Sequence, residues 1–502
     1  MYSAYYLLEK SVNDCLQIND YESALVGIKD FVTDVMIRDA APGEIVGSNK
    51  LDDLCKKVGN AFAENSGNKD IIEENFRADG NKVAIVCTGL YRYGGTSLLI
   101  SDLIRANPGK ECLVLATNFF EDMKQEDFEA DRIGDTGSQF LVAPSNIATI
   151  KMQWLINQLV EAKPSRIFLL NHHQDSIIIS TAQLFTEKSK VIFVHHADYN
   201  LCLGVHMSGA VHADIHNVGH CNCRLNEKIS DNVYLPLVAS DKKSNRAGDK
   251  FPDTDIITCS SGTAHKFLNF YLYPYTELIA QRLVERGGTH VHIGSLPDVN
   301  LSAIRKRLTE YGVEENRFVH IPWVKDLWLT LIEQRVDLFI GSFPIGGART
   351  TLEVMGAGIP IMMHQSYLSR FYSSRDIVYP NHFVWKYPHQ FIHLLKAING
   401  EMLTAHSLRS RGHYLLNYCT ESMDLAGEIT RICDGSPIMV SPMLYTHDPD
   451  LLDRALHYSH LDHLARSEST NRVAGSGSVF SSTGTGWRNS LKAGVARLFS
   501  TK

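Results

Sequence analysis

Short apolar runs alternate with stretches of helical periodicity along most of the chain, and this alternation restricts the fold more than any other feature. The runs that are typical of buried strands lie at 83–89, 112–118, 166–171, 191–196, 256–261, 289–295, 317–321, 336–340 and 359–363. Strands that alternate with helices form parallel sheets covered by helices on both faces. The polar segment 239–254 divides the runs into two series. The sequence therefore predicts an α/β protein with two doubly wound, Rossmann-like domains.

The remaining segments extend this division. Residues 1–78 show helical periodicity without a convincing strand and predict a helical cap. The predicted parts of the chain are the cap (1–78), a first Rossmann-like domain (79–238), a linker (239–254), a second Rossmann-like domain (255–435), a C-terminal helical segment (436–466) and a terminal stretch (467–502).

Composition excludes several classes of protein. With 49 basic and 56 acidic side chains the formal charge is −7, so we expect no nucleic-acid partner, which would require a basic face. The ten cysteines form no regular framework and indicate reduced thiols in the cytoplasm. We expect no signal peptide, and no window approaches the roughly 18 apolar residues of a membrane span.

The terminal stretch combines two patterns. Residues 467–486 are low in complexity, whereas Trp487, Leu491 and Val495 begin one apolar helical face that basic side chains flank. This face of 487–502 suits an anionic membrane surface, which would make the protein peripheral on the inner membrane surface. It equally suits a neighbouring subunit or the chain's own domain. The oligomeric state stays open.

A glycine-rich loop follows the predicted strand 336–340. Gly341 and Gly347 lie in this loop, and Thr350 and Thr351 stand at the expected start of the next helix. A strand, a glycine loop and a helix N-terminus together favour an anion, because free backbone N–H groups and the positive end of the helix dipole point to one place. The loop therefore predicts an anion-binding site.

Two motifs in this region are similar to those of a known family. The segments GVEENRFVHIPWV (312–324) and VDLFIGSFPIGGARTTLEVMGAGIPIM (336–362) resemble O-GlcNAc-transferase-like glycosyltransferases and their bacterial protein-glycosylating relatives. The resemblance covers about 255–365 and is looser over 80–235. It implies a GT-B fold, with two domains facing across a cleft. It further implies transfer of a hexosyl or N-acetylhexosaminyl group from a UDP-sugar to a protein or to a glycan or lipid-linked acceptor, without a cofactor or bound metal.

The same resemblance implies particular donor-binding residues. In the family, a lysine contacts the donor phosphates, a glycine-threonine loop binds the diphosphate, an acidic residue binds the ribose, and backbone groups of one loop hold the base. The residues at the matching positions of this chain are Lys266, Gly347, Thr350, Thr351, Glu353, Pro322 and Lys325.

The chain departs from the family in two places. Ala348 replaces a loop histidine, and Arg349 stands beside it as a further candidate for stabilising the leaving diphosphate together with Lys266. The paired-glutamate pattern of retaining GT-B enzymes is incomplete, because Gly346 lies seven residues before Glu353. Retention and inversion of configuration both remain open.

In the first domain, the loop YRYGGTS (91–97) resembles the family loop beneath the transferred sugar or acceptor. Its Gly94, Gly95 and Thr96 are the candidate contacts. The loop lacks the G-x-G-x-x-G spacing of a dinucleotide site. The alternative is that the glycine pair only permits a tight turn.

Histidines end two neighbouring predicted strands of that domain. His195 and His196, with Asp198 nearby, follow one strand, and His172 and His173 follow the preceding one. Histidine has a pKa near neutrality and can be oriented by a carboxylate, which suits a general base. We predict His196 and His195 as the base ahead of the other pair, which lies on the sugar and acceptor side.

The segment 206–223 is rich in histidine and cysteine, which are common metal ligands. Its spacing fits no standard zinc pattern, and HADIHNVGH (212–220) also fits an extended strand with alternating faces. We therefore predict no metal.

Two other functions fit the same sequence. A nucleotide-sugar epimerase or phosphorylase uses the same fold. A catalytically silent partner subunit is the third reading, and the missing loop histidine at Ala348 favours it.

Overall fold

The computed structural model describes residues 3–37, 45–91, 95–123, 138–267, 271 and 273–443, with 452, 455 and 459 as single positions. Gly94, most of the predicted segment 436–466 and all of 467–502 lie outside these residues. The chain divides into two compact units, 1–454 and 455–502, and the first of these contains both sheets. None of the helices in the described ranges combines the length and the apolarity of a membrane span.

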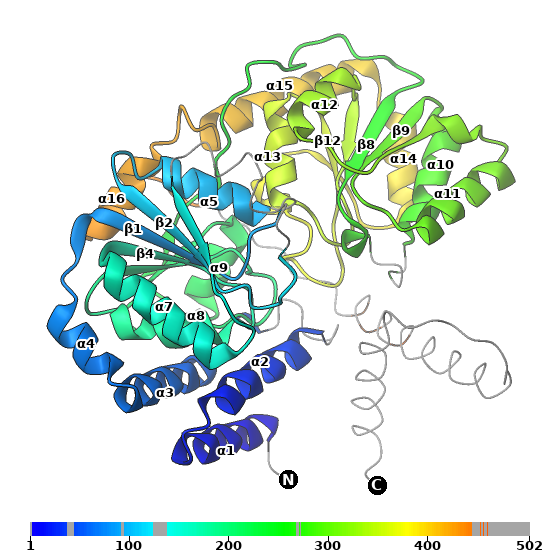
Figure 1. The fold of residues 1–502 in the computed structure, drawn as a ribbon. Coiled ribbons are helices and arrows are strands. Elements are labelled where there is room, and N and C mark those ends of the chain that lie inside the picture. The colour runs from blue at the N-terminus through cyan, green and yellow to red at the C-terminus, as the bar shows by residue number, and fades with distance from the viewer. Residues whose placement is uncertain are drawn as a thin grey trace, which may run out of the picture. The chain divides into compact units, whose positions relative to one another are not determined.

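The first half of this unit contains a parallel sheet (Figure 1). Its described strands are β1 (Asp79–Cys87), β2 (Glu111–Ala116), β3 (Gln139–Val142), β4 (Pro164–Leu170), β5 (Lys190–His195), β6 (Val211–Asp214) and β7 (Val233–Tyr234). They lie in the order β3-β2-β1-β4-β5-β6-β7. The order reverses between β1 and β4, so loops from both strands meet at the carboxyl end of the sheet there.

Alternation along β1 explains how helices cover both faces. Val83 and Ile85 belong to one buried cluster with α5 (Gly95–Arg105), whereas Ala84 and Val86 belong to another with α7 (Ala148–Ala162) and α8 (Ser176–Ala182). Successive side chains of a strand point to opposite faces, and an apolar run without polar interruption therefore feeds two cores.

The second half repeats this pattern. Its described strands are β8 (Ile257–Ser261), β9 (Thr289–Ile293), β10 (Phe318–Ile321), β11 (Leu338–Ile340), β12 (Ile361–His364) and β13 (Phe383–Trp385). They lie parallel in the order β10-β9-β8-β11-β12-β13, which reverses between β8 and β11. The helices between and after these strands are α10 (Tyr275–Arg286), α11 (Asp298–Glu310), α12 (Leu327–Glu333), α13 (Ala348–Gly356), α14 (Pro388–Ala397) and α15 (Gly400–Asn417).

The predicted helical cap is present. Its helices are α1 (Ala4–Gln17), α2 (Tyr21–Ile37), α3 (Asn49–Asn65) and α4 (Asn68–Asn75), and they share a buried cluster with α7 and α8. Polar contacts fix the cap to the first sheet as well. The Glu22 carboxylate accepts hydrogen bonds from the amides of Ala148 and Thr149 at the start of α7. The Asp52 carboxylate accepts from the amides of Gly204 and His206.

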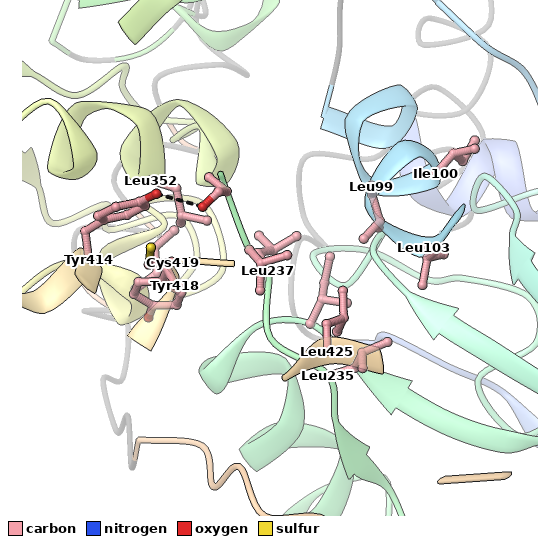
Figure 2. Packing of buried hydrophobic residues seen from close by; sticks show 14 of the residues in the cluster. Leu99, Ile100, Leu103, Leu235, Leu237, Leu352, Tyr414, Tyr418, Cys419 and Leu425 are labelled. Carbon is pink, nitrogen blue, oxygen red and sulfur yellow. Dashed lines mark hydrogen bonds between the residues drawn. The ribbon is translucent and has the colours of Figure 1, made fainter. Parts of the chain in front are cut away.

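One buried cluster joins the two halves (Figure 2). Leu237, in the connection after β7, lies between side chains of α5 and Leu352 of α13. The Tyr414 hydroxyl donates to the Ala239 carbonyl at 2.7 Å. The helix α16 (Leu425–Asp434) places Leu425 beside Leu235 of the first half. The end of the predicted second domain therefore packs on the first sheet.

The histidine-rich segment differs from the expected extended strand. Only Val211–Asp214 forms a strand, and Asn217–Leu225 forms α9. His216 is the residue before this helix and already has extended backbone angles. The extended backbone ends shortly after Asp214, and the residues from Asn217 onward form a helix that packs on β6 and β7.

Replacement of Asp52 tests the attachment of the cap. In the unmodified protein the Asp52 carboxylate accepts hydrogen bonds from the amides of Gly204 and His206, and in Asp52→Ala both amides lose this acceptor. Each unpaired buried donor costs about 1–3 kcal/mol of stability. We expect the free energy of unfolding in urea to fall by about 2–4 kcal/mol. Asp53→Ala, at the exposed neighbouring position, is the matched control and should change it by less than about 0.5 kcal/mol. Equal effects of both variants would contradict this role.

Candidate functional site

The reversal between β8 and β11 brings two loops together at the carboxyl end of the second sheet. The short 3-10 helix Ala264–Lys266 follows β8, and the glycine loop 341–347 follows β11. The Ile345 amide donates to the Lys266 carbonyl, and the Lys266 ammonium lies 3.3 Å from the Gly346 carbonyl oxygen. Residues that are 80 positions apart in sequence thus lie in one site.

The Lys266 ammonium lies at the N-terminus of α13. A Cβ atom added to Gly347, the residue that caps this helix, would stand 2.8 Å from Lys266 Nζ. Burial lowers the pKa of Lys266 to about 8. No carboxylate pairs with it within the described ranges. A cation beside the positive end of a helix, without an acidic partner, is an arrangement that an anion stabilises.

Close packing sets the shape of the glycine loop. The Gly346 amide donates to the Tyr372 carbonyl, and a Cβ atom at Gly346 would lie 2.4 Å from the carbonyl oxygen of Ser373. That oxygen is backbone and cannot move aside as a flexible side chain would. Gly347 has no side chain that could accept a hydrogen bond from the first turn of α13. The loop is therefore closed on one side and presents helix amides on the other.

The two predicted threonines differ in their environment. Thr351 is buried, and its hydroxyl donates to the Gly347 carbonyl at 2.8 Å, which fixes the first turn of the helix. Thr350 is partly exposed, and its Oγ1 would lie 3.2 Å from a Cβ atom at Gly347. Thr350 is thus the threonine that faces the space beside Lys266.

Arg349 joins the two halves of the chain. Its guanidinium donates to Asp102 of α5 at 2.7 Å and to the Val238 carbonyl, and lies 3.9 Å from the Glu353 carboxylate. Asp102 is only 4% exposed, and burial raises its pKa while Arg349 opposes that shift. The contact places Arg349 between α13 and α5. Its predicted role on the diphosphate stays a prediction.

The remaining donor-side residues lie around the same end of the second sheet. Glu353 is partly buried one turn after Arg349. Pro322 and Lys325 are exposed in the connection between β10 and α12. β10 runs parallel to β11, so this connection begins at the same carboxyl end of the sheet as the glycine loop. Their roles toward ribose and base stay predictions.

On the first half, Gly95 and Thr96 begin α5. A Cβ atom at Gly95 would lie 3.8 Å from Cβ of Arg349, so the N-termini of α5 and α13 lie close to one another. Thr96 is partly exposed. These positions can face a group held at the start of α13.

The four candidate histidines fall into two environments. His172 and His196 are partly exposed at the carboxyl ends of β4 and β5, whereas His173 and His195 are 1% exposed. The His172 Nδ1–H can donate to the Gln174 side-chain oxygen at 2.8 Å, which leaves Nε2 with the lone pair. Burial, with the nearby charge of His172, lowers the pKa of His196 to about 3. Both are thus neutral at pH 7.

The carboxylate expected beside His196 has another partner. Asp198 Oδ2 lies 2.8 Å from Nδ1 of His216, and this pairing raises the pKa of His216 to about 9 against the effect of burial. His195 is paired with Asp214 inside the core, at 3.1 Å. In the structure Asp198 thus pairs with His216, the N-cap residue of α9, and its expected role beside His196 stays a prediction.

Several contacts between the halves involve residues for which the sequence offered no signal. Asp376, in the short helix after β12, accepts from the Val218 amide at the start of α9, and its carbonyl accepts from the Asn217 side chain. Tyr199 and Tyr372 rings lie 6.1 Å apart across the same boundary. Only the fold brings these segments together, since at least 158 residues separate Asp376 from its α9 partners.

Solved structures show what this architecture is. No protein-family model and no curated protein matches the chain. Similar structures include a glycosyltransferase from Rickettsia africae ESF-5, with 10% identity over 71% of this chain and 98% of that chain, and a TM-score of 0.54. Another is HepE from Anabaena, solved with UDP and glucose, with 11% identity over 70% and 99% of the two chains and a TM-score of 0.54. The chain has the GT-B fold.

A third similar structure bears on the resemblance seen in the sequence. It is a mutant of the O-GlcNAc transferase from Thermobaculum terrenum, with 11% identity over 84% of this chain and 83% of that chain, and a TM-score of 0.50. These structural neighbours are GT-B glycosyltransferases, in agreement with the family that the motifs resemble. The predicted fold class is therefore confirmed.

Proposed function

We propose that this protein is a glycosyltransferase that moves a hexosyl or N-acetylhexosaminyl group from a UDP-sugar to a protein or glycan acceptor. The observation that carries the proposal is the Lys266 ammonium, which lies beside Gly347 at the N-terminus of α13 without an acidic partner among the described residues. The GT-B fold of the chain and the UDP held by HepE, a structure with the same fold, support a nucleotide-sugar donor.

The arrangement suits a leaving nucleoside diphosphate. When the bond between the anomeric carbon and the phosphate oxygen breaks, its electron pair stays on the diphosphate. Lys266, the amides of the first turn of α13 and the Thr350 hydroxyl would stabilise that charge, since donors placed beforehand need no reorganisation. Arg349, held by Asp102, would add positive potential at the same helix end. This part of the reaction requires no metal.

The acceptor side lies at the carboxyl end of the first sheet. We propose that His196 removes the acceptor proton as the acceptor oxygen bonds to the anomeric carbon, with Gly95 and Thr96 beneath the sugar. His172, whose tautomer Gln174 fixes, is the alternative base. Each histidine is neutral at pH 7, and so can accept a proton without prior loss of one.

Removal of the Lys266 charge tests the donor site. In Lys266→Ala, UDP should bind about 10–100-fold more weakly, because a charge-assisted hydrogen bond to phosphate is lost. Because burial lowers the pKa of Lys266 to about 8, a bound diphosphate should raise that pKa again. Binding of UDP to the unmodified protein near pH 8 to 9 should therefore take up protons, which calorimetry in buffers of different ionisation enthalpy measures.

The control for this test is Lys306→Ala, an exposed lysine of α11 in the same half. It should leave both the affinity for UDP and the proton uptake unchanged. Loss of affinity in Lys306→Ala, or an unchanged affinity in Lys266→Ala, would contradict the proposed diphosphate site.

Replacement of the histidines tests the transfer step. His196→Ala should lower acceptor-dependent release of UDP by about 100-fold or more, the contribution of a general base, with nearly unchanged affinity for UDP. His172→Ala should have a smaller effect on the same rate. A larger loss of rate in His172→Ala than in His196→Ala would identify His172 as the base. Normal turnover in both variants would show that neither histidine is the base.

A catalytically silent, donor-binding subunit remains the second candidate. Ala348 in place of the family histidine favours it, as does the depressed pKa of His196, which makes that ring a weak base. Tight UDP binding without release of UDP from any donor in a panel of UDP-sugars and acceptors would support this candidate over the transferase.

A further inference from the structure

Four metal-ligating side chains of the first half converge in the core, away from the donor loop of the second half. They are His195 at the end of β5, His212 and Asp214 of β6, and Cys223 of α9. One ligand atom from each lies within 4.8 Å of the others. All four residues are buried, with His212 the most exposed at 6%. Burial of ionisable groups costs free energy unless they are paired or coordinate a metal.

Hydrogen bonding orients His212 in the way that metal-bound histidines are oriented. Its Nδ1 lies 3.1 Å from the Val205 carbonyl oxygen, which can only accept, so Nδ1 carries a proton. In the neutral ring Nε2 then carries a lone pair, and it faces Asp214 Oδ1 at 3.0 Å. Two acceptors at this distance require a cation between them, which is either a second proton on the ring or a metal ion.

Asp214 is held in a similar manner. Its Oδ2 accepts from the Asn232 side-chain amide at 2.6 Å, so that Oδ1 is directed to the two imidazoles. The same Oδ1 lies 3.1 Å from Nδ1 of His195, and that nitrogen lies 3.4 Å from Cys223 Sγ. Carboxylates and imidazoles that bind metals are commonly fixed by such outer hydrogen bonds.

The separations fit a tetrahedral ion. Bond lengths of about 2.0–2.3 Å from zinc to nitrogen, oxygen and sulfur give donor-to-donor distances of about 3.3–3.6 Å. The two shortest observed separations, 3.0 and 3.1 Å, are slightly below this range, and the third, 3.4 Å, lies within it. The remaining separations extend to 4.8 Å. The most distant ligand atoms would have to approach one another by roughly 1 Å to close the set around one ion.

Charge supports the same conclusion. A divalent ion with the Asp214 carboxylate, the Cys223 thiolate and two neutral imidazoles has no net charge, which a fully buried site favours. Thiolate, imidazole and carboxylate together are the ligands that zinc accepts. The ligands also come from β5, β6 and α9, and a bound ion would fix α9, whose first turn contacts Asp376 of the second half.

We propose that His195, His212, Asp214 and Cys223 form a structural site for a divalent transition-metal ion, zinc in the first place, that is separate from the donor site. The site holds α9 against β5 and β6. The proposal does not depend on glycosyl transfer, and neither does its test.

Metal content of the full-length protein, purified without a histidine tag, tests the site. We expect about one zinc ion per chain by elemental analysis of the unmodified protein. Cys223→Ser and Asp214→Asn should each lower the zinc content at least about tenfold under the same dialysis. Cys221→Ser is the matched control, because Cys221 lies on the same helix, is partly exposed and belongs to no candidate ligand set of the described residues. It should retain the ion.

A spectroscopic measurement covers the case in which the ligand variants fail to fold. The unmodified protein and Cys221→Ser, loaded with cobalt in place of zinc, should both show a thiolate-to-cobalt charge-transfer band and the visible bands of a tetrahedral ion. Unmodified protein that holds no transition metal after dialysis against zinc, and that gives no such bands with cobalt, would leave the four residues as a hydrogen-bonded network and overturn the proposal. Equal loss of the ion in Cys221→Ser and Cys223→Ser would also overturn it.

Discussion

The hydrogen-bonded pairing of β8 with β11 is the constraint on which the rest of the donor site depends. These strands are neighbours because the order of the second sheet reverses between them. Their following loops must therefore leave the sheet side by side, and Lys266 reaches Gly346 although 80 residues separate the two. The glycine loop then turns into α13 with its first amides toward the same place. The proposed anion site thus follows from the topology before any particular side chain is considered.

A second set of contacts joins the halves and brings the candidate donor-side and acceptor-side residues near one another. Arg349 of α13 reaches Asp102 of α5, and Asp376 caps α9 from the opposite half. The buried cluster through Leu237 and Leu352 continues between the same elements. Buried ion pairs contribute little net stability but penalise the wrong geometry, because either charge left unpaired is costly. We therefore expect the Arg349–Asp102 pair to favour one arrangement of the halves more than to add stability.

The sequence was informative where chemistry and local pattern coincide. Alternating apolar runs predicted most strands of both sheets, but not β3, β7 or β13. The family resemblance placed Lys266 and the glycine loop in one site, and the structure brings Lys266 to the start of α13. It was uninformative where the partner lies on a remote segment. The pairing of Asp198 with His216 and of Arg349 with Asp102 depends on three-dimensional proximity alone. The sequence shows that the segment containing β6 and α9 is rich in histidine and cysteine. It does not reveal the four-residue set, because His195 comes from another strand and no linear spacing connects it to the others.

The affinity of the unmodified protein for uridine, UMP and UDP, measured by calorimetry, tests the donor site most directly. If Lys266 and the N-terminus of α13 hold the diphosphate, most of the binding free energy should come from the phosphates. UDP should then bind at least about tenfold more tightly than UMP, and uridine most weakly. Equal affinities for the three ligands, or no binding of UDP, would contradict the assignment of this loop as a diphosphate site.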